Sequence, residues 1–268
     1  MQKIRVIPLL LLKGTGVEKG IGFEDHVYVG CATNAARMFN QFNCDELILL
    51  DIVATEESRR AQLEVVAEIV EESFMPITVG GGVRSLDDMR QLLKVGADRI
   101  TINTAAVETP ELVTEGARQF GSQCIVVSID ARRHADGTFE VFTRCGTKAT
   151  GLDPVTHAKA MEAAGCGEIL LTSIDQDGTM KGYDLELTRR VADAVSVPVI
   201  ACGGAGSEKH LAEGISEGHA SAVAAGAFFV FFGRRRTVLI TYPTDHDLKM
   251  HMPAERVRKK DRPGLWWP

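Results

Sequence analysis

Four aspartates end or directly follow short apolar runs of the sequence. Asp51 ends LILLD, Asp130 ends IVVSID, and Asp175 and Asp177 lie in TSIDQDGT. If these runs are parallel strands, the carboxylates meet at one edge of a sheet, where their repulsion raises the pKa of at least one of them. We expect Asp130 to transfer protons, whereas holding loops through hydrogen bonds explains Asp51 and Asp175 equally well.

Two glycine-rich turns also follow apolar runs: TVGGGVRS at 78–85 and ACGGAGSE at 201–208. Backbone N–H groups at glycine can approach an anion closely, and the N-terminus of a following helix adds favourable partial charge. The pair predicts a substrate with a phosphate at each end; alternatively, the glycines only permit tight turns. Polar groups at other strand ends could complete two phosphate cradles: Asn103, Thr104, Thr172 and the N–H of Gly226.

Charged residues stand at the opposite ends of four of the runs: Arg5, Glu46, Arg99 and Glu168. In a closed sheet these two positive and two negative side chains converge as a ring at the bottom of a barrel. From the residues alone, this ring is a plug of ion pairs that closes the barrel.

Eight short runs rich in Val, Ile and Leu supply the strands that position these residues: 5–12, 46–52, 76–79, 99–103, 124–130, 168–175, 197–201 and 221–232. Segments with helical spacing lie between them, such as 58–74, 86–96, 153–165 and 184–195. Alternating strands and helices predict a (β/α)8 TIM barrel, with a doubly wound open sheet as the alternative.

The two halves of the chain share features at one constant offset of 122 residues. Glu46 corresponds to Glu168, Pro76 to Pro198 and Gly81 to Gly203 (168 − 46, 198 − 76 and 203 − 81). This repetition indicates two duplicated half-barrels fused into a single domain, residues 1–243. Residues 244–268 mix charge and proline, and we expect a loosely ordered C-terminal tail.

Composition narrows the classes of function. The 268 residues carry a net charge of −6, so no basic field favours nucleic acid or a membrane surface. No apolar run approaches the roughly 18 residues of a membrane span, and the N-terminus does not resemble a signal peptide, so we expect a cytoplasmic protein. The six cysteines never reach CxxC spacing, which indicates reduced structural thiols; we expect no metal and no cofactor.

Several motifs together resemble the cyclase subunit of imidazole glycerol phosphate synthase: DELILLDI, TVGGGVRS, INTAAVETPEL, VVSIDA, GEILLTSIDQDGTMKGYD and ACGGAG. The resemblance runs from the N-terminus to about Gly233. It implies a barrel that takes ammonia from a class I glutaminase and passes it through its interior. The ammonia is used at the C-terminal rim to cleave and cyclise a bis-phosphorylated ribosyl intermediate.

The resemblance assigns roles residue by residue. It makes the ring of Arg5, Glu46, Arg99 and Glu168 an ammonia gate, with Arg99 where the family usually has Lys, and it places Asp98 at the docking surface. It assigns one phosphate site to Gly82, Asn103 and Thr104, and the other to Thr172, Gly203, Gly204 and Gly226. Lys19 matches a mobile-loop lysine, and Asp130 matches one of two catalytic aspartates.

The other catalytic aspartate is missing, because the family's IPCLD motif reads IPLLL here and Leu11 stands in its place. Leucine cannot transfer protons. This departure, with LLLK and VLITYP, is more similar to cyclase-like subunits found with surface-polysaccharide genes. Those are thought to work with a glutaminase and a sugar amidotransferase, converting an acetamido group of an activated sugar into an acetamidino group.

We therefore expect a barrel that delivers ammonia to a phosphorylated or nucleotide-linked substrate. The alternatives are an authentic cyclase of histidine biosynthesis and a non-catalytic scaffold that activates its glutaminase. The related sugar isomerase of histidine biosynthesis ranks last, since it needs no ammonia gate.

Overall fold

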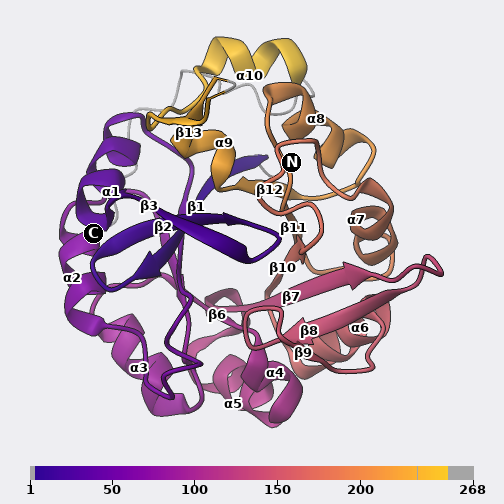
Figure 1. The fold of residues 1–268 in the computed structure, drawn as a ribbon. Coiled ribbons are helices and arrows are strands. Elements are labelled where there is room, and N and C mark those ends of the chain that lie inside the picture. Colours follow the sequence, from indigo (N-terminus) through magenta and orange to yellow (C-terminus); the bar gives the residue numbers. More distant parts are fainter. Residues whose placement is uncertain (1–3, 234, 253–268) are drawn as a thin grey trace, which may run out of the picture.

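The computed structural model describes residues 4–233 and 235–252 and contains a closed barrel of parallel strands (Figure 1). The barrel strands are β1 (Arg5–Lys13), β4 (Leu47–Asp51), β5 (Ile77–Gly80), β6 (Arg99–Ile102), β7 (Ile125–Arg133), β10 (Glu168–Ser173), β11 (Val199–Cys202) and β12 (Ala222–Ala225). The last strand pairs with the first, with Arg5 beside Ala222. This pairing confirms the predicted (β/α)8 barrel and excludes the open sheet.

Helices surround the barrel (Figure 1). They are α1 (Ala32–Gln41), α2 (Leu63–Glu71), α3 (Leu86–Lys94), α4 (Thr104–Glu108), α5 (Glu111–Phe120), α6 (Pro154–Ala164), α7 (Leu185–Ala192), α8 (Glu208–Ser216) and the short α9 (Ala227–Val230), with a 3-10 turn at Ser122–Cys124. Ser85 caps α3 by accepting the N–H of Asp88, and Ser207 caps α8 by accepting the N–H of His210. The two caps lie 122 residues apart (207 − 85), so the repeat extends to the chemistry of the helix ends.

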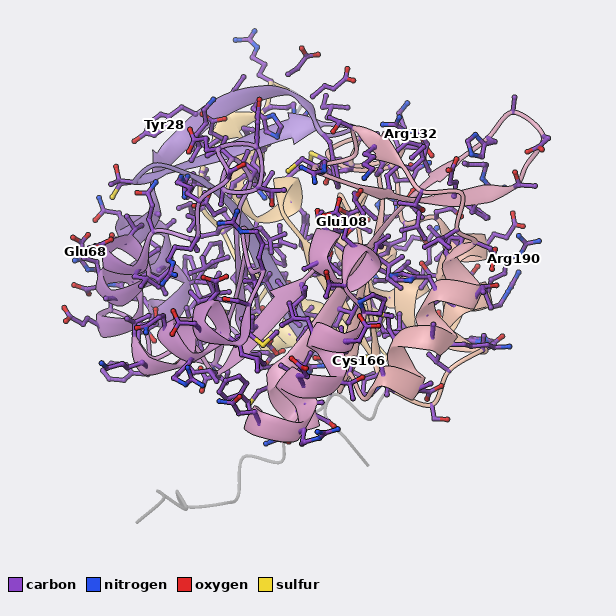
Figure 2. All side chains as sticks on the ribbon, turned by 90° about the horizontal axis from the view of Figure 1, so that it is seen from below. Tyr28, Glu68, Glu108, Arg132, Cys166 and Arg190 are labelled. Atoms are coloured by element: carbon purple, nitrogen blue, oxygen red, sulfur yellow. The ribbon has the colours of Figure 1, made fainter. Side chains whose placement is uncertain are left out.

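Two strands continue past the barrel into hairpins that the sequence did not predict. β1 leads into β2 (Gly16–Ile21) and β3 (Glu24–Cys31), and β7 leads into β8 (Phe139–Thr143) and β9 (Lys148–Ala149). The first hairpin crosses the centre of the ring of strands in Figure 1. Figure 2, which labels Tyr28 on β3 and Arg132 on β7, shows both hairpins along the same edge of the barrel.

Alternation along each strand divides the core in two. Side chains such as Val6, Leu10 and Leu12 face outward and pack against the helices. The opposite faces fill the barrel with a smaller apolar cluster: Ile7, Leu9, Ile48, Val126, Leu170, Ile200, Cys202, Ala222 and Ala224. The interior of the barrel is therefore mostly hydrocarbon.

The C-terminal region differs from the prediction in two places. Residues 221–232 do not form one strand: β12 ends at Ala225, and α9 and the short strand β13 (Phe231–Phe232) follow. β13 pairs with β14 (Thr237–Val238). Within the expected loose tail, α10 (Asp245–His251) has a capping box and buries Leu248, which corrects that expectation for residues 244–252. The rest of the expected tail, 253–268, lies outside the described residues.

No helix in the described part of the chain is long and apolar enough to span a membrane.

Candidate active site

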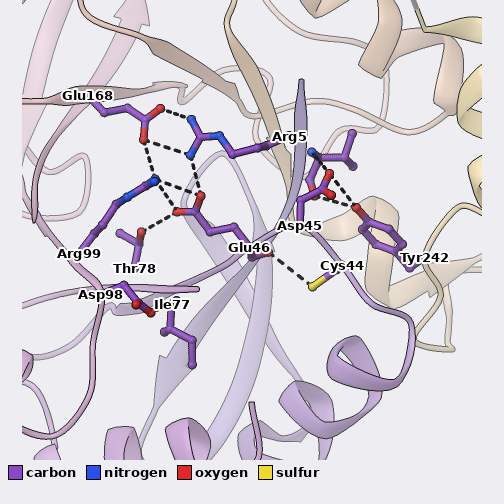
Figure 3. A network of polar contacts seen from close by, with 11 residues as sticks. Arg5, Cys44, Asp45, Glu46, Ile77, Thr78, Asp98, Arg99, Glu168 and Tyr242 are labelled. Atoms are coloured by element: carbon purple, nitrogen blue, oxygen red, sulfur yellow. Dashed lines mark hydrogen bonds and ion pairs between the residues drawn. The ribbon is translucent and has the colours of Figure 1, made fainter. Parts of the chain in front are cut away.

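Four charged side chains form a closed ring at the end of the barrel where the strands begin (Figure 3). Nη1 of Arg5 lies 2.6 Å from Oε2 of Glu46, and Arg5 also pairs with Glu168. Nη1 of Arg99 lies 3.1 Å from Oε2 of Glu46 and 3.0 Å from Oε2 of Glu168. Thr78 donates its hydroxyl hydrogen to Oε1 of Glu46 at 2.7 Å. Each arginine contacts both glutamates, so the predicted ring is present and carries no net charge.

The predicted docking residue Asp98 lies at the same end of the barrel (Figure 3). It is exposed, and its Oδ2 accepts the backbone N–H of Ile77 at 2.8 Å. Phe42 and Phe74, in the connections that lead into β4 and β5, expose 41% and 94% of their surface. Connections from helix to strand lie at the end where the strands begin. This face therefore combines the charged ring with an acidic side chain and two exposed aromatic rings.

Thr101 is a polar exception in the apolar interior of the barrel. It lies on β6 two residues after Arg99, so it shares the inward face of that strand one layer closer to the opposite end. It is buried, and its Oγ1 has no hydrogen-bond partner among the residues that the structure describes. A buried hydroxyl without a partner costs free energy, which a small polar molecule beside it would recover.

A cavity of about 640 Å³ opens where the strands end. Its volume suits a small-molecule substrate. It gathers most of the predicted site residues: Leu11, Lys19, Asp51, Gly82, Asn103, Thr104, Asp130, Thr172, Asp177 and Gly226 line it. Gly203, Gly204 and Asp175 are not among its lining residues.

Asp130 is buried at this mouth, on β7. Burial raises the pKa of its carboxyl group to about 7, and the neighbouring charge of Asp177 acts in the same direction. Nδ2 of Asn103 donates to Oδ2 of Asp130 at 3.0 Å, and the hydroxyl of Ser128 lies 3.3 Å from its Oδ1. A carboxyl group with this pKa can both accept and donate a proton near neutral pH, as the predicted role requires.

Lys19 reaches the cavity from β2. Its Nζ donates to the backbone carbonyl of Leu9 at 2.5 Å, and burial lowers its pKa to about 8. The charge of Asp177 opposes this lowering, and burial in turn raises the pKa of Asp177. A Cβ atom at Gly226 would clash with Nζ of Lys19, so glycine leaves the space that the ammonium group fills. The lysine thus lies against one predicted phosphate-binding residue.

Asp51 and Asp175 have contacts that favour loop holding. Oδ1 of Asp51 accepts the N–H of Ala54 at 3.1 Å, and its Oδ2 lies 2.6 Å from Nη1 of Arg59. Asp175 is exposed and accepts the N–H of Arg133 at 2.8 Å. Hydrogen bonding within loops accounts for the contacts of Asp175, whereas Asp51 also lines the cavity and so fits both explanations.

The glycine turns have a packing requirement of their own. Gly81 (φ 107°) and Gly203 (φ 88°) adopt conformations unfavourable for other residues. A Cβ atom would clash with the backbone of Asp51 in the first turn and of Ser173 in the second. In both halves, therefore, a close approach of neighbouring backbone requires glycine at the equivalent position. Gly82 also lines the cavity, whereas anion binding at Gly203 and Gly204 stays a prediction.

Leu11 lies at the mouth where the resemblance calls for a carboxylate. It is in register with Leu50 on β4 and with Glu18 on β2. Leu11 and Leu50 are half-buried, pack on the inner apolar cluster and line the cavity. One side of the mouth is therefore apolar at its floor, while Asp130 makes the β7 side acidic.

Sequence reasoning missed several residues of this site. Glu18 and Cys145 line the cavity from the unpredicted hairpins, and Arg59, which bonds Asp51, lies before α2, although the spacing of 58–74 predicts a helix from 58 onward. The glycines at the hairpin turns, Gly22 and Gly146, were the available signal for both hairpins. No group of three or more His, Cys, Asp or Glu side chains within residues 4–233 and 235–252 could hold a metal ion.

Comparison with known proteins agrees with this architecture. Residues 5–233 match a family model described as "Histidine biosynthesis protein". The chain belongs to this family. The histidine biosynthesis proteins are isomerase and cyclase barrel enzymes, and the matched range includes every barrel strand and all the residues assigned above to the ring and the cavity.

Proposed function

We propose that this barrel receives ammonia from a class I glutaminase docked at the charged ring and delivers it to a phosphorylated or nucleotide-linked sugar at the mouth. There, with a sugar amidotransferase, ammonia replaces the oxygen of an acetamido group, which leaves as water, and an acetamidino group forms. The product belongs to surface-polysaccharide biosynthesis. The observation that carries this proposal is the alignment of a closed charged ring, an apolar interior and a substrate-sized cavity.

The ring end supports ammonia entry. Paired charges that encircle the barrel opening exclude other ions, yet a small rearrangement of Arg99 would admit a neutral molecule. Phe42 and Phe74 beside it provide exposed apolar surface, which is enriched at protein interfaces. The interior supports transit of neutral ammonia in particular, since the apolar core disfavours ammonium. Thr101 offers one hydrogen-bonding group on the way.

The mouth supports chemistry different from cyclisation. Asp130 is buried with a pKa near 7, but Leu11 replaces the β1 aspartate that the cyclase resemblance pairs with it. General acid–base groups typically contribute about 10²–10⁴-fold to rate, so loss of one of a pair leaves cyclisation very slow.

An authentic histidine cyclase is the second candidate. The observation in its favour is the survival of Asp130, Lys19 and Gly82 together in one cavity. In this case Asp130 alone transfers the protons of cyclisation.

Rescue of a histidine auxotroph lacking its own cyclase tests the two candidates. The unmodified chain, Leu11→Asp and the neutral, similarly shaped Leu11→Asn are compared at matched expression. We expect rescue only by Leu11→Asp, because a carboxylate restores the missing acid–base group. Rescue by the unmodified chain would overturn the sugar proposal in favour of the histidine reaction, and rescue by Leu11→Asn would show that charge at this position is irrelevant.

A further inference from the structure

Glu18 brings a carboxylate to the place where β1 lacks one. It lies opposite Leu11 in the antiparallel pairing of β1 and β2. Side chains directly opposite each other in an antiparallel pair point to the same side of the sheet, and both residues line the cavity. The next pair, Leu12 and Val17, points the other way into the outer core. The register therefore directs Glu18 into the mouth.

One oxygen of Glu18 binds nothing within the part of the chain that the structure describes. The side chain is 15% exposed, and its Oε1 lies 3.5 Å from Nζ of Lys13, which is 54% exposed. Oε2 is buried and has no hydrogen-bond partner among the described residues. Burying a carboxylate oxygen without a partner is unfavourable. Fold stability does not explain this arrangement, whereas a hydrogen-bond donor bound in the cavity would, once a small rotation of the side chain brings Oε2 to the cavity surface.

Apolar side chains adjoin this oxygen acceptor. Leu11 and Leu50 lie side by side in the parallel pairing of β1 and β4, and both are half-buried at the cavity floor. A ligand group placed here contacts hydrocarbon on one side and a carboxylate on the other. A lone hydroxyl would leave the leucines unfilled, and a phosphate would be repelled by the carboxylate.

We propose that Glu18, Leu11 and Leu50 form a recognition subsite for a substrate substituent in which an N–H donor adjoins a small apolar group. The carboxylate accepts the N–H, and the leucines contact the apolar group. An N-acylated amino sugar phosphate has this chemistry, with its phosphate free to reach Gly82 or Lys19. The inference rests on the proposed function, because it assumes that the cavity holds the molecule that accepts ammonia.

Binding of two sugar phosphates to the full chain tests the subsite. The probes are N-acetylglucosamine 1-phosphate and glucose 1-phosphate, and calorimetry gives the Kd of each. We expect the unmodified protein to prefer the N-acetylated probe by about tenfold, the effect of roughly one hydrogen bond to a charged group. Glu18→Met removes the acceptor at similar length and should abolish the preference without weakening glucose 1-phosphate. Glu18→Gln, which retains a carbonyl acceptor, should keep part of it.

Glu24→Met is the matched control, because Glu24 is exposed on the same hairpin and does not line the cavity. It should leave both affinities unchanged. If Glu18→Met keeps the full preference for the N-acetylated probe, the subsite is wrong and the proposed function still stands. If Glu18→Met does not fold, the same conclusion follows when Glu18→Gln and Leu11→Asn both keep the full preference. Failure of the unmodified protein to bind either probe counts against both.

Discussion

The two ends of the barrel use charge in opposite ways. At the ring, Glu46 and Glu168 each contact two arginines, so every charge has a partner at hydrogen-bonding distance. At the mouth, Asp130 and Lys19 are also buried, yet neither forms an ion pair among the residues that the structure describes, and burial shifts both pKa values towards neutrality. The same barrel thus holds one set of charges for structure and another ready for proton exchange.

The largest expected effect concerns the mouth. Asp130→Asn should reduce ammonium-dependent turnover in the reconstituted complex by about 10²–10⁴-fold, because the amide cannot exchange a proton near neutral pH. Asp175→Asn is the control: Asp175 is exposed outside the cavity lining, and asparagine can still accept the N–H of Arg133. If both variants lose turnover equally, Asp130 does not act as the proton-transfer group.

At the ring we expect loss of stability. Glu46→Gln removes one charge from a buried network and leaves two arginines undercompensated. The free energy of unfolding should fall by about 2–4 kcal/mol, less than for a fully buried network because both arginines are partly exposed. Glu72→Gln, in an exposed pair with Arg37 that solvent screens, should cost much less. Urea denaturation measures both, and equal costs would contradict the pairing argument.

Removing a carboxylate from the mouth should instead stabilise the protein, and increasingly so at higher pH. Because the pKa of Asp130 is near 7 in the folded chain and about 3.9 when unfolded, the folded state binds more protons between those values, so stability falls as pH rises through this window. The stabilisation by Asp130→Asn should therefore be about 2–3 kcal/mol greater at pH 8 than at pH 5. Urea titrations at pH 5 and pH 8 measure this stabilisation. If it is the same at both pH values, the pKa of Asp130 is not raised in the folded chain.

The smallest expected effect concerns partner binding beside the ring. Asp98→Lys should weaken glutaminase binding by about tenfold, since it reverses a charge on the proposed interface. Asp98→Ala loses the contact with the N–H of Ile77 without reversing the charge, and should weaken binding less. Surface plasmon resonance with the glutaminase compares them. Unchanged affinity in Asp98→Lys would place the docking surface elsewhere.

The barrel could be predicted from sequence because strands buried on both faces appear as apolar runs. The 122-residue repeat gave independent support, since each strand of one half has a counterpart in the other. The ring could be predicted equally well, because charged residues at the starts of parallel barrel strands all lie at the same end of the barrel. Asp130 and Gly82 followed from the same logic at the strand ends.

The rest depended on features with no local signal. In 221–232 the apolar run continues through Gly226 without a break, although the chain changes there from β12 to α9. The unpartnered oxygen of Glu18 depends on a pairing register between β1 and β2, and a shift of one residue would turn the side chain away. The hydrogen bonds of Asp51 to Arg59 likewise depend on a turn that resembles a helix in its sequence.

The closure between β1 and β12 has a consequence for how the chain is made. Arg5 pairs with Ala222, 217 residues later (222 − 5), and the hydroxyl of Tyr242 then bonds the carbonyl of Val6. During synthesis on the ribosome, this edge of β1 therefore stays unpaired until almost the whole chain has emerged. An unpaired strand edge can associate with other chains. The β2 hairpin covers Leu11–Lys13 on the same edge as soon as it forms. It is thus also a local shield during synthesis, which limits the exposed edge to the first few residues of the strand.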